Sequence, residues 1–150
     1  MIHCLLKGAD KEYMTNFEKT LDIVHRAMDA GSIRRNVIAN NIANAQVPNF
    51  KRSEVNFESE LKRALDSEQQ RPALELTLTD PRHISNHTKK DYRDVTPRRV
   101  LDFVSQSKNN GNNVDAEQEA MLALQNQMLY TMLAEAATFE FSQVNMVLRG

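Results

Sequence analysis

The sequence predicts a mainly α-helical fold. Long amphipathic helices at the two ends of the chain are expected to pack together in coiled-coil fashion, beside a small irregular or β-containing middle region. A helix-capping signal at Thr15 precedes an apolar pattern of helical spacing, a second capping signal at Asp115 precedes another, and the residues between them are polar and interrupted by proline. With 150 residues, 41% of them hydrophobic, the chain is about one domain long.

The first helix is predicted to begin at Thr15. Thr15 and Glu18 have the T-x-x-E spacing of a capping box, in which two side chains satisfy backbone donors at a helix start. A row of positions then advances in steps of four and three, as in a heptad repeat: Phe17, Leu21, Val24, Met28, Gly31, Arg35, Ile38, Ile42 and Ala45. The row is apolar except at Gly31 and Arg35. Gly31 lowers helix propensity, and with Ser32 it predicts a weak point or bend.

Three asparagines lie near the end of this helix. Asn40, Asn41 and Asn44 are three or four residues apart, which makes them neighbours on one helical surface. One interpretation is a fraying helix end whose amides face water. The other is a polar strip that hydrogen-bonds a neighbouring helix and fixes its register, as a buried asparagine does in coiled coils.

A tight turn is predicted directly after the asparagines. Pro48 presets φ for the second position of a turn, and Asn49 tolerates the left-handed conformation that a type II turn needs at its third position. The chain is therefore expected to bend sharply before Phe50, which anchors the outgoing segment.

The middle region gives weaker signals. Residues 56–65 predict a short helix, because Phe57, Leu61 and Leu65 share one face. The stretch Leu74–Thr79, "LELTLT", alternates like a half-buried strand, whereas residues 80–99 are polar, broken by proline and expected to be irregular.

The second long helix is predicted after "NNGNN", residues 109–113, which is typical of a loop. Asp115 and Gln118 form a second capping box, and Glu117 and Glu119 suit the first turn of a helix. Proline and glycine are then absent until Gly150. One heptad row contains Gln118, Gln125, Met132, Phe139 and Met146, and Met121 and Met128 extend its apolar side.

Signals of chemistry are weak throughout the sequence. We predict no catalytic residues, no cofactor and no metal site, since the sequence lacks a Gly-rich phosphate loop, a G-x-S-x-G elbow and a metal-protease motif. His83 and His87 are four apart but stand in a polar, proline-broken stretch, which favours solvated side chains over a metal site. The basic pairs at 34–35, 51–52 and 98–99 are also interpreted as solvated. A net charge of -1 gives no reason to expect nucleic acid or membrane insertion.

The segment "ANNIANAQVPNFKR" resembles the A-N-N-I-A-N-A-x-T-P-G-[FY]-K-R signature of the axial proteins of the bacterial flagellum, the rod and hook family. The matching positions are Ala39, Asn40, Asn41, Ile42, Ala43, Asn44, Ala45, Pro48, Asn49, Phe50, Lys51 and Arg52. Val47 replaces the usual threonine and Asn49 the usual glycine. The C-terminal "EFSQVNMVLRG" is also similar, so the resemblance covers residues 14–150.

The resemblance also implies a division of the chain. Residues 1–13 precede the usual start of such proteins and are interpreted as an extension, with Met14 as candidate initiator. The N-terminal helix and turn motif then occupy 14–52, a loop-rich middle region 53–113, and the C-terminal helix 114–150.

By this resemblance the chain is expected to be a structural rod subunit, not an enzyme. Such proteins are exported uncleaved through the flagellar type III apparatus and assemble in the periplasm. The implied partners are other rod proteins, copies of the same chain, and membrane-ring and export-apparatus proteins. We expect an assembly seam at Phe17, Leu21, Val24, Met28, Ile38, Ile42, Met121, Leu122, Met128, Leu129, Met132, Phe139 and Met146. A sister axial protein and a soluble helical partner-binding protein remain alternatives.

Overall fold

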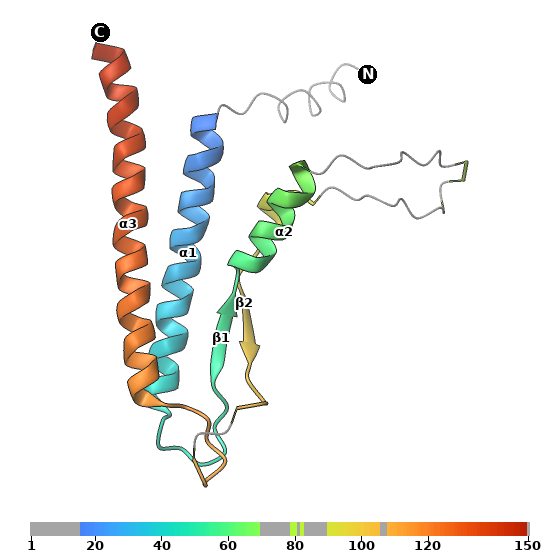
Figure 1. Cartoon of the computed structure of the whole chain (residues 1–150), viewed down its shortest axis with the longest axis vertical. Helices are drawn as coiled ribbons and strands as arrows, with labels where there is room; N and C mark the ends of the chain where they lie inside the picture. The colour runs from blue at the N-terminus through green and yellow to red at the C-terminus, as the bar shows by residue number, and fades with distance from the viewer. Residues whose placement is uncertain (1–15, 70–78, 81, 83–89, 106–107, 150) are drawn as a thin grey trace, which may run out of the picture.

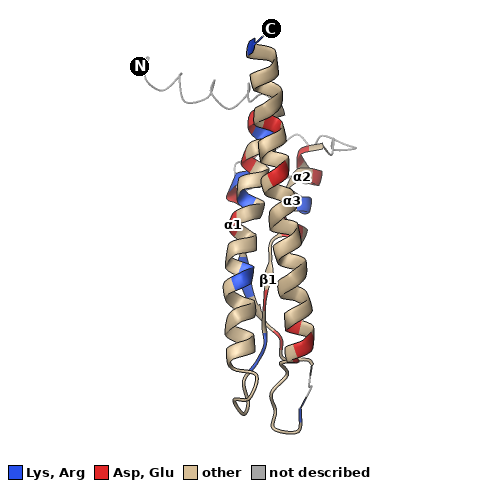
Figure 2. Ribbon diagram, turned by 90° about the vertical axis from the view of Figure 1, so that its left-hand side faces the viewer, with Lys and Arg blue, Asp and Glu red and all other residues tan. Residues whose placement is uncertain are grey.

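The structure, a computed structural model, describes residues 16–69, 79–80, 82, 90–105 and 108–149. Two long helices, α1 (Asn16–Ala43) and α3 (Ala116–Arg149), form an antiparallel hairpin along the whole molecule (Figures 1 and 2). The predicted mainly α-helical fold with long terminal helices is therefore confirmed. None of the helices in the described ranges is both long and apolar enough to span a lipid bilayer.

Helix α1 continues without interruption through Gly31, so the predicted weak point there is wrong. The reason is close packing against α3. A Cβ atom placed on Gly31 would lie 3.6 Å from the Tyr130 ring, and the Gly31 carbonyl accepts a hydrogen bond of 2.9 Å from the Asn126 side chain. The packing and the hydrogen bond from α3 compensate for the low helix propensity of Gly31, although a Cβ atom would also fit there in ordinary contact.

The start of α3 agrees with the predicted cap. The Asp115 side chain accepts a hydrogen bond of 3.0 Å from the backbone N–H of Glu117, one of the donors that a helix start leaves unsatisfied. The other predicted cap, at Thr15, lies outside the described residues.

The middle region contains a small sheet, which confirms the β-containing alternative expected there, although the sequence did not assign these residues to strands. Strands β1 (Ser53–Asn56) and β2 (Arg98–Leu101) pair antiparallel, with Ser53 opposite Leu101, and β1 packs against α1. The predicted strand at 74–79 lies outside the described residues except for Thr79, which is not in a strand. The predicted short helix is confirmed as α2 (Glu58–Gln69).

Side-chain contacts from α1 hold this middle region in place. Lys19 forms an ion pair of 2.6 Å with Glu68 at the end of α2, and Arg34 pairs with Glu58 at its start. Arg26 donates a hydrogen bond of 2.9 Å to the backbone carbonyl of Arg93, directly after Tyr92 in the short 3-10 helix η1 (Tyr92–Asp94).

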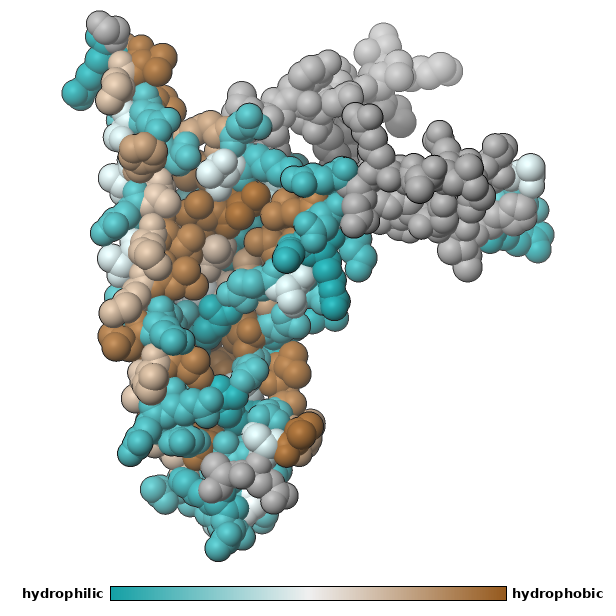
Figure 3. Space-filling view, viewed as in Figure 1, coloured by the Kyte–Doolittle hydropathy of each residue, from teal (hydrophilic) through white to brown (hydrophobic). Residues whose placement is uncertain are grey.

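The two long helices differ in how much apolar surface they bury. The α1 positions of the expected seam are mostly buried or half-buried, and on α3 so are Leu122 and Leu129. The other α3 seam positions are exposed: Met121, Met128, Met132, Phe139 and Met146. Apolar side chains run along the surface of α3 and over the part of the molecule between α3 and α2, where α1 lies (Figures 1 and 3). Helix α3 therefore has one apolar side against α1 and a second that this chain leaves uncovered.

Candidate functional site

The candidate site lies at the loop end of the hairpin, where the turn after α1 meets the loop before α3. In the turn, Asn49 has a φ of 59°, in the left-handed region, and the N–H of Phe50 donates to the carbonyl of Val47 at 3.4 Å. These features confirm the predicted bend at Pro48. We call residues 44–52 the turn segment and residues 108–113 the asparagine loop.

The asparagine loop binds the backbone of the turn segment through side chains. Asn112, which is fully buried, donates from one amide nitrogen to the carbonyls of Asn44 at 3.0 Å and Val47 at 2.8 Å. Lys108 donates to the carbonyl of Ala45 at 2.6 Å. These bonds give partners to backbone carbonyls of the turn segment, which lies just after the end of α1 and outside its helical ladder.

Contacts also run in the opposite direction. Lys51 of the turn segment donates to the carbonyl of Gly111 at 2.9 Å, and the N–H of Asn49 donates to the carbonyl of Asn110 at 3.1 Å. Gly111 has a φ of 78°, and a Cβ atom there would lie 2.5 Å from the Asn49 side chain. Glycine is therefore required at 111 both for backbone conformation and for space.

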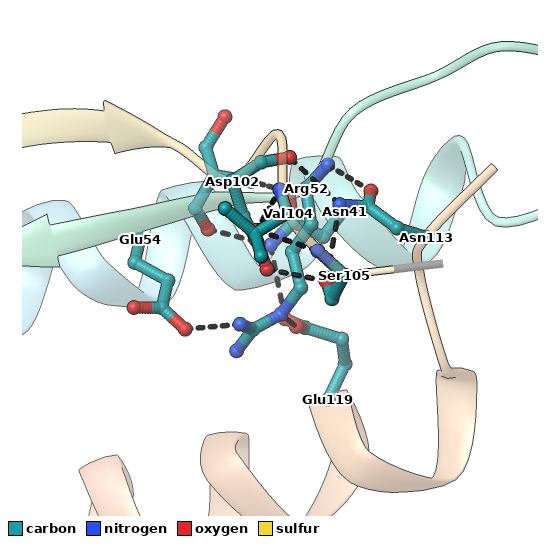
Figure 4. Close-up of polar contacts among 9 residues, drawn as sticks. Asn41, Arg52, Glu54, Asp102, Val104, Ser105, Asn113 and Glu119 are labelled. Atoms are coloured by element: carbon teal, nitrogen blue, oxygen red, sulfur yellow. Dashed lines mark hydrogen bonds and ion pairs between the residues drawn. The ribbon is translucent and has the colours of Figure 1, made fainter. Parts of the chain in front are cut away.

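A buried polar cluster of Asn41, Arg52, Ser53, Asn113 and Glu119 lies beside this loop (Figure 4). Asn41 donates to the carbonyl of Ser53 at 2.8 Å and accepts from its N–H at 3.1 Å, so one amide side chain pairs with β1 as another strand would. The same amide nitrogen lies 3.1 Å from a carboxylate oxygen of Glu119. Asn41 thus connects α1, β1 and α3.

Arg52 and Glu119 form an ion pair inside the cluster. The Nε of Arg52 donates to Glu119, and a second guanidinium nitrogen donates to Glu54 (Figure 4). The side chains of Arg52 and Glu119 are 9% and 1% exposed. Burial lowers the pKa of Arg52, but hydrogen bonds and charge from Glu119 and Glu54 outweigh it and hold that pKa above its usual value. Arg52 therefore stays charged, and its charge is paired.

Asn113 joins the cluster to both strands. Its amide oxygen accepts from the N–H of Arg52 at 2.6 Å, and its amide nitrogen donates to the carbonyl of Asp102 at 2.8 Å. The Asp102 N–H in turn donates to the Arg52 carbonyl at 2.9 Å. The side-chain and backbone bonds of Ser105 and Val104 hold the pKa of Asp102 below its usual value. The cluster thus fixes four segments at one point: α1, β1, the loop after β2 and α3.

The three asparagines near the end of α1 have different environments in the structure. Only Asn41 points into a neighbouring element; Asn40 is exposed, and Asn44 donates back to the carbonyl of Asn40 at 2.7 Å. The polar-strip hypothesis therefore holds for Asn41, and its main partners are a strand and a carboxylate. The prediction that the basic pair at 51–52 is solvated is wrong for Arg52, because Glu119 compensates the burial of its charge.

Sequence reasoning missed Asn112, Asn113 and Glu119 as members of the site. From the sequence, Glu119 is expected only to suit the first turn of a helix, and residues 109–113 only to form a loop. The available signal was chemical: an amide-rich loop and a carboxylate are suitable partners for an asparagine-rich, basic turn. His83 and His87 lie outside the described residues.

Comparison with known proteins matches this part of the molecule. A family model described as "Flagella basal body rod protein" matches residues 21–51, which contain most of α1 and the turn segment. A flagellar basal body rod protein FlgB of Borreliella burgdorferi is 43% identical over 91% of this chain and 100% of its own length. The chain belongs to the FlgB family. Its Bacillus subtilis relative, also named FlgB, is 34% identical over 91% of this chain and 98% of its own length.

The FlgB match at 91% coverage extends well beyond the residues of the family model. In this FlgB-family chain the cluster pairs each of its charges internally, so the arrangement is suited to fixing geometry. The Ser53 hydroxyl has no hydrogen-bond partner among the described residues, but the amides and charged groups of the cluster are hydrogen-bonded, and such a buried network specifies one arrangement of the elements that supply it. The site therefore sets the angle and register between α1, the small sheet and α3.

Proposed function

We propose that this chain is a structural subunit of the proximal rod of the bacterial flagellar basal body. In that role it assembles with copies of itself and with other rod proteins into the shaft that transmits torque. Membership of the FlgB family supports the proposal, and the relatives described above carry that name, which favours the proximal rod protein over the sister axial protein FlgC.

The observation that carries the proposal is the uncovered apolar side of α3. Exposed apolar residues recur from Met121 through Met132 and Phe139 to Met146, along a helix of 34 residues. At 1.5 Å per residue the stretch from Met121 to Met146 is about 38 Å long. Contiguous apolar surface of that extent marks an interaction site in a soluble protein, and a neighbouring subunit would cover it.

We divide the expected assembly seam into two parts. The buried and half-buried α1 residues, with Leu122 and Leu129, form an inner seam within one subunit, whereas Ile42, which is 41% exposed, belongs to the outer seam. The exposed methionines of α3 and Phe139 form an outer seam between subunits. In this arrangement the polar cluster holds the inner seam in register, so that each subunit presents its outer seam at the same angle.

The location and partners follow from the same proposal. We place the chain in the periplasmic rod, reached by export without a cleaved signal peptide, and in contact with membrane-ring and export-apparatus proteins as well as rod proteins. The alternative of a soluble helical partner-binding protein predicts a stable monomer or dimer that does not assemble further.

Electron cryotomography of cells lacking the gene tests the function directly. We expect basal bodies with membrane rings and no rod, in cells that do not swim. An intact rod and hook would refute the proposal.

A pair of substitutions tests the outer seam itself. Met132→Asp places a charge in the seam and should abolish rods and swimming, whereas Thr131→Asp, at the adjacent exposed position on another side of α3, should leave both intact. Both purified variants should keep the unfolding temperature of the parent chain. Swimming by the Met132→Asp strain would exclude this surface from assembly.

A further inference from the structure

The two-stranded sheet has one closed edge and one open edge. Strand β1 lies between α1 and β2, so β2 forms the outer edge of the sheet (Figure 1). On the inner edge the Asn41 side chain accepts from the Ser53 N–H and donates to the Ser53 carbonyl, and so takes the place of a further strand. All four residues of β2 are exposed. The outer edge is therefore accessible to another strand.

The ladder determines which backbone groups of β2 face outward. In an antiparallel pair, alternate residues direct their N–H and carbonyl groups toward the partner strand. The Asp102 N–H donates to the Arg52 carbonyl, so Asp102 and Val100 direct their backbone groups toward β1. Arg99 and Leu101 then direct theirs away from β1, and among the described residues these groups have no hydrogen-bond partner. The open edge thus offers two donors and two acceptors.

The side chains along this strand are complementary to a second copy of themselves. The sequence "RRVLD" begins with a cation and ends with an anion. When two such strands lie antiparallel about Val100, Arg98 of each copy faces Asp102 of the other and the two Val100 side chains meet. The same register places Arg99 opposite Leu101, so the outward N–H and carbonyl groups of the two copies pair with each other.

The neighbouring registers are less favourable. Pairs of outward-facing residues are kept only when one strand slides by two residues past the other. Sliding in one direction places Arg99 against Arg99, and sliding in the other places Val100 against Asp102. Like charges directly opposite destabilise a strand pair, and an apolar side chain gives a carboxylate no partner. The charge pattern therefore selects the register about Val100.

Both charged groups are available for this contact. Arg98 forms no ion pair among the described residues, and with Val100 it borders an open pocket of about 650 Å³ that leaves room for a partner's side chains. The Asp102 carboxylate accepts three hydrogen bonds from Val104 and Ser105, and within the described part of the chain it accepts none from a cation. A carboxylate has about four acceptor sites, so one remains for a guanidinium.

We propose that two copies of the free chain pair through their β2 strands into one continuous four-stranded sheet. The same surface serves on both copies, so the contact is isologous and closes at a dimer. A shaft repeats a head-to-tail contact instead, so the sheet dimer is a form of the chain outside the assembled rod. It covers an exposed edge that would otherwise pair with other strands. The dimer forms in solution and is independent of the proposed rod function.

A single cysteine tests the pairing in the purified full chain. Val100 faces its own copy across the two-fold axis at a position without ladder hydrogen bonds between the copies, where Cα atoms lie about 4.5 Å apart and a disulfide fits. We therefore expect Val100→Cys, combined with Cys4→Ser, to give a disulfide-linked dimer on oxidation. Val104→Cys, at a more exposed position beyond the strand, should remain monomeric. If Val100→Cys links no better than Val104→Cys, the proposed pairing is wrong.

Charge reversal provides a second measurement that needs no cysteine. Arg98→Glu sets a second carboxylate opposite Asp102 at both ends of the contact, whereas Arg99→Glu makes the same change of net charge opposite Leu101. In sedimentation equilibrium over a range of concentrations, Arg98→Glu should weaken the dimer roughly tenfold and Arg99→Glu much less. Both variants should keep the helical circular dichroism of the parent chain, because both side chains are exposed. Equal effects of the two reversals, or a parent chain that stays monomeric at every concentration, would overturn the proposal.

Discussion

Removing the Glu119 carboxylate should destabilise the fold sharply. The substitution Glu119→Ala leaves the guanidinium of Arg52 in a site where its side chain is 9% exposed, with the partly exposed Glu54 as its remaining partner. It also removes the 3.1 Å contact to the amide of Asn41. The buried charge, not the lost contact, dominates the cost.

The magnitude follows from this geometry. Breaking a buried ion pair by removing one partner costs about 3–5 kcal/mol of the free energy of unfolding. Because Glu54 stays in place and its side chain is 58% exposed, we take the lower end, about 3 kcal/mol. For a chain of this size that loss lowers the unfolding temperature by about 6–12 °C.

Thermal and urea unfolding followed by circular dichroism measures the effect, with Glu117→Ala as the matched control. Glu117 lies in the same first turn of α3 but is exposed, so its removal costs only the helix-dipole interaction, below about 1 kcal/mol. Glu119→Gln keeps the shape and one acceptor without the charge, and it should fall between the two.

The double variant Arg52→Met with Glu119→Leu separates charge from packing. Replacing both partners of a buried pair by apolar residues is often neutral for stability. We therefore expect the double variant to recover most of the stability that Glu119→Ala loses. If Glu119→Ala instead unfolds at the same temperature as Glu117→Ala, the buried pair does not stabilise the fold and our account of the cluster is wrong.

Four further substitutions test separate contacts of the fold. Gly31→Ala should raise the free energy of unfolding by about 0.5–1 kcal/mol in urea titrations, because alanine has the higher helix propensity and the added methyl meets only ordinary contacts. Gly111→Ala should lower the free energy of unfolding by about 1–2 kcal/mol, because alanine is strained in the left-handed backbone conformation of residue 111. Burial raises the pKa of Glu58, but the Arg34 hydrogen bond outweighs it and leaves that pKa below its usual 4.5. Its stabilisation, below about 1 kcal/mol, is present above pH 4.5 and is lost as the pH falls through the lowered pKa of Glu58, so the deficit of Glu58→Gln measured by thermal unfolding at pH 7 should shrink steadily as the pH is lowered below 4.5. Ile42→Asp should leave the unfolding temperature unchanged, since Ile42 is 41% exposed, yet abolish swimming; normal motility would exclude Ile42 from the seam.

The two long helices are predictable from sequence because the same spacing of apolar residues recurs over many turns. Apolar spacing over 28 and 34 residues, with a cap at Asp115, gave both terminal helices. The bend at Pro48 and the left-handed Asn49 were equally predictable, because turn preferences belong to single residues.

The small sheet and the polar cluster were not predictable by the same rules. Strands of four residues are too short to show a period, and β1 and β2 pair across more than 40 positions of sequence. A buried Arg52 looks like any surface arginine until its partner is known, and Glu119 lies 67 residues away. The chemical complementarity of the asparagine-rich turn and the asparagine-rich loop is the sequence feature that indicates where the partners of Arg52 lie.

The position of the cluster explains why the fold uses polar bonds at one end of the hairpin and aromatic packing at the other. Helix α1 is 28 residues, or about 42 Å, long, so a tilt of about 5° at the loop end displaces its far end by roughly 4 Å. Apolar contacts are non-directional and resist such a tilt weakly, whereas paired amides and an ion pair require defined angles. The far end meets α3 through one edge-on ring pair, Phe17 with Phe141, which can adjust to a neighbour. A small error in the angle between α1 and α3 at the loop end becomes a large displacement at the far end of α1. The directional hydrogen bonds and the ion pair therefore lie at the loop end, where that angle is set.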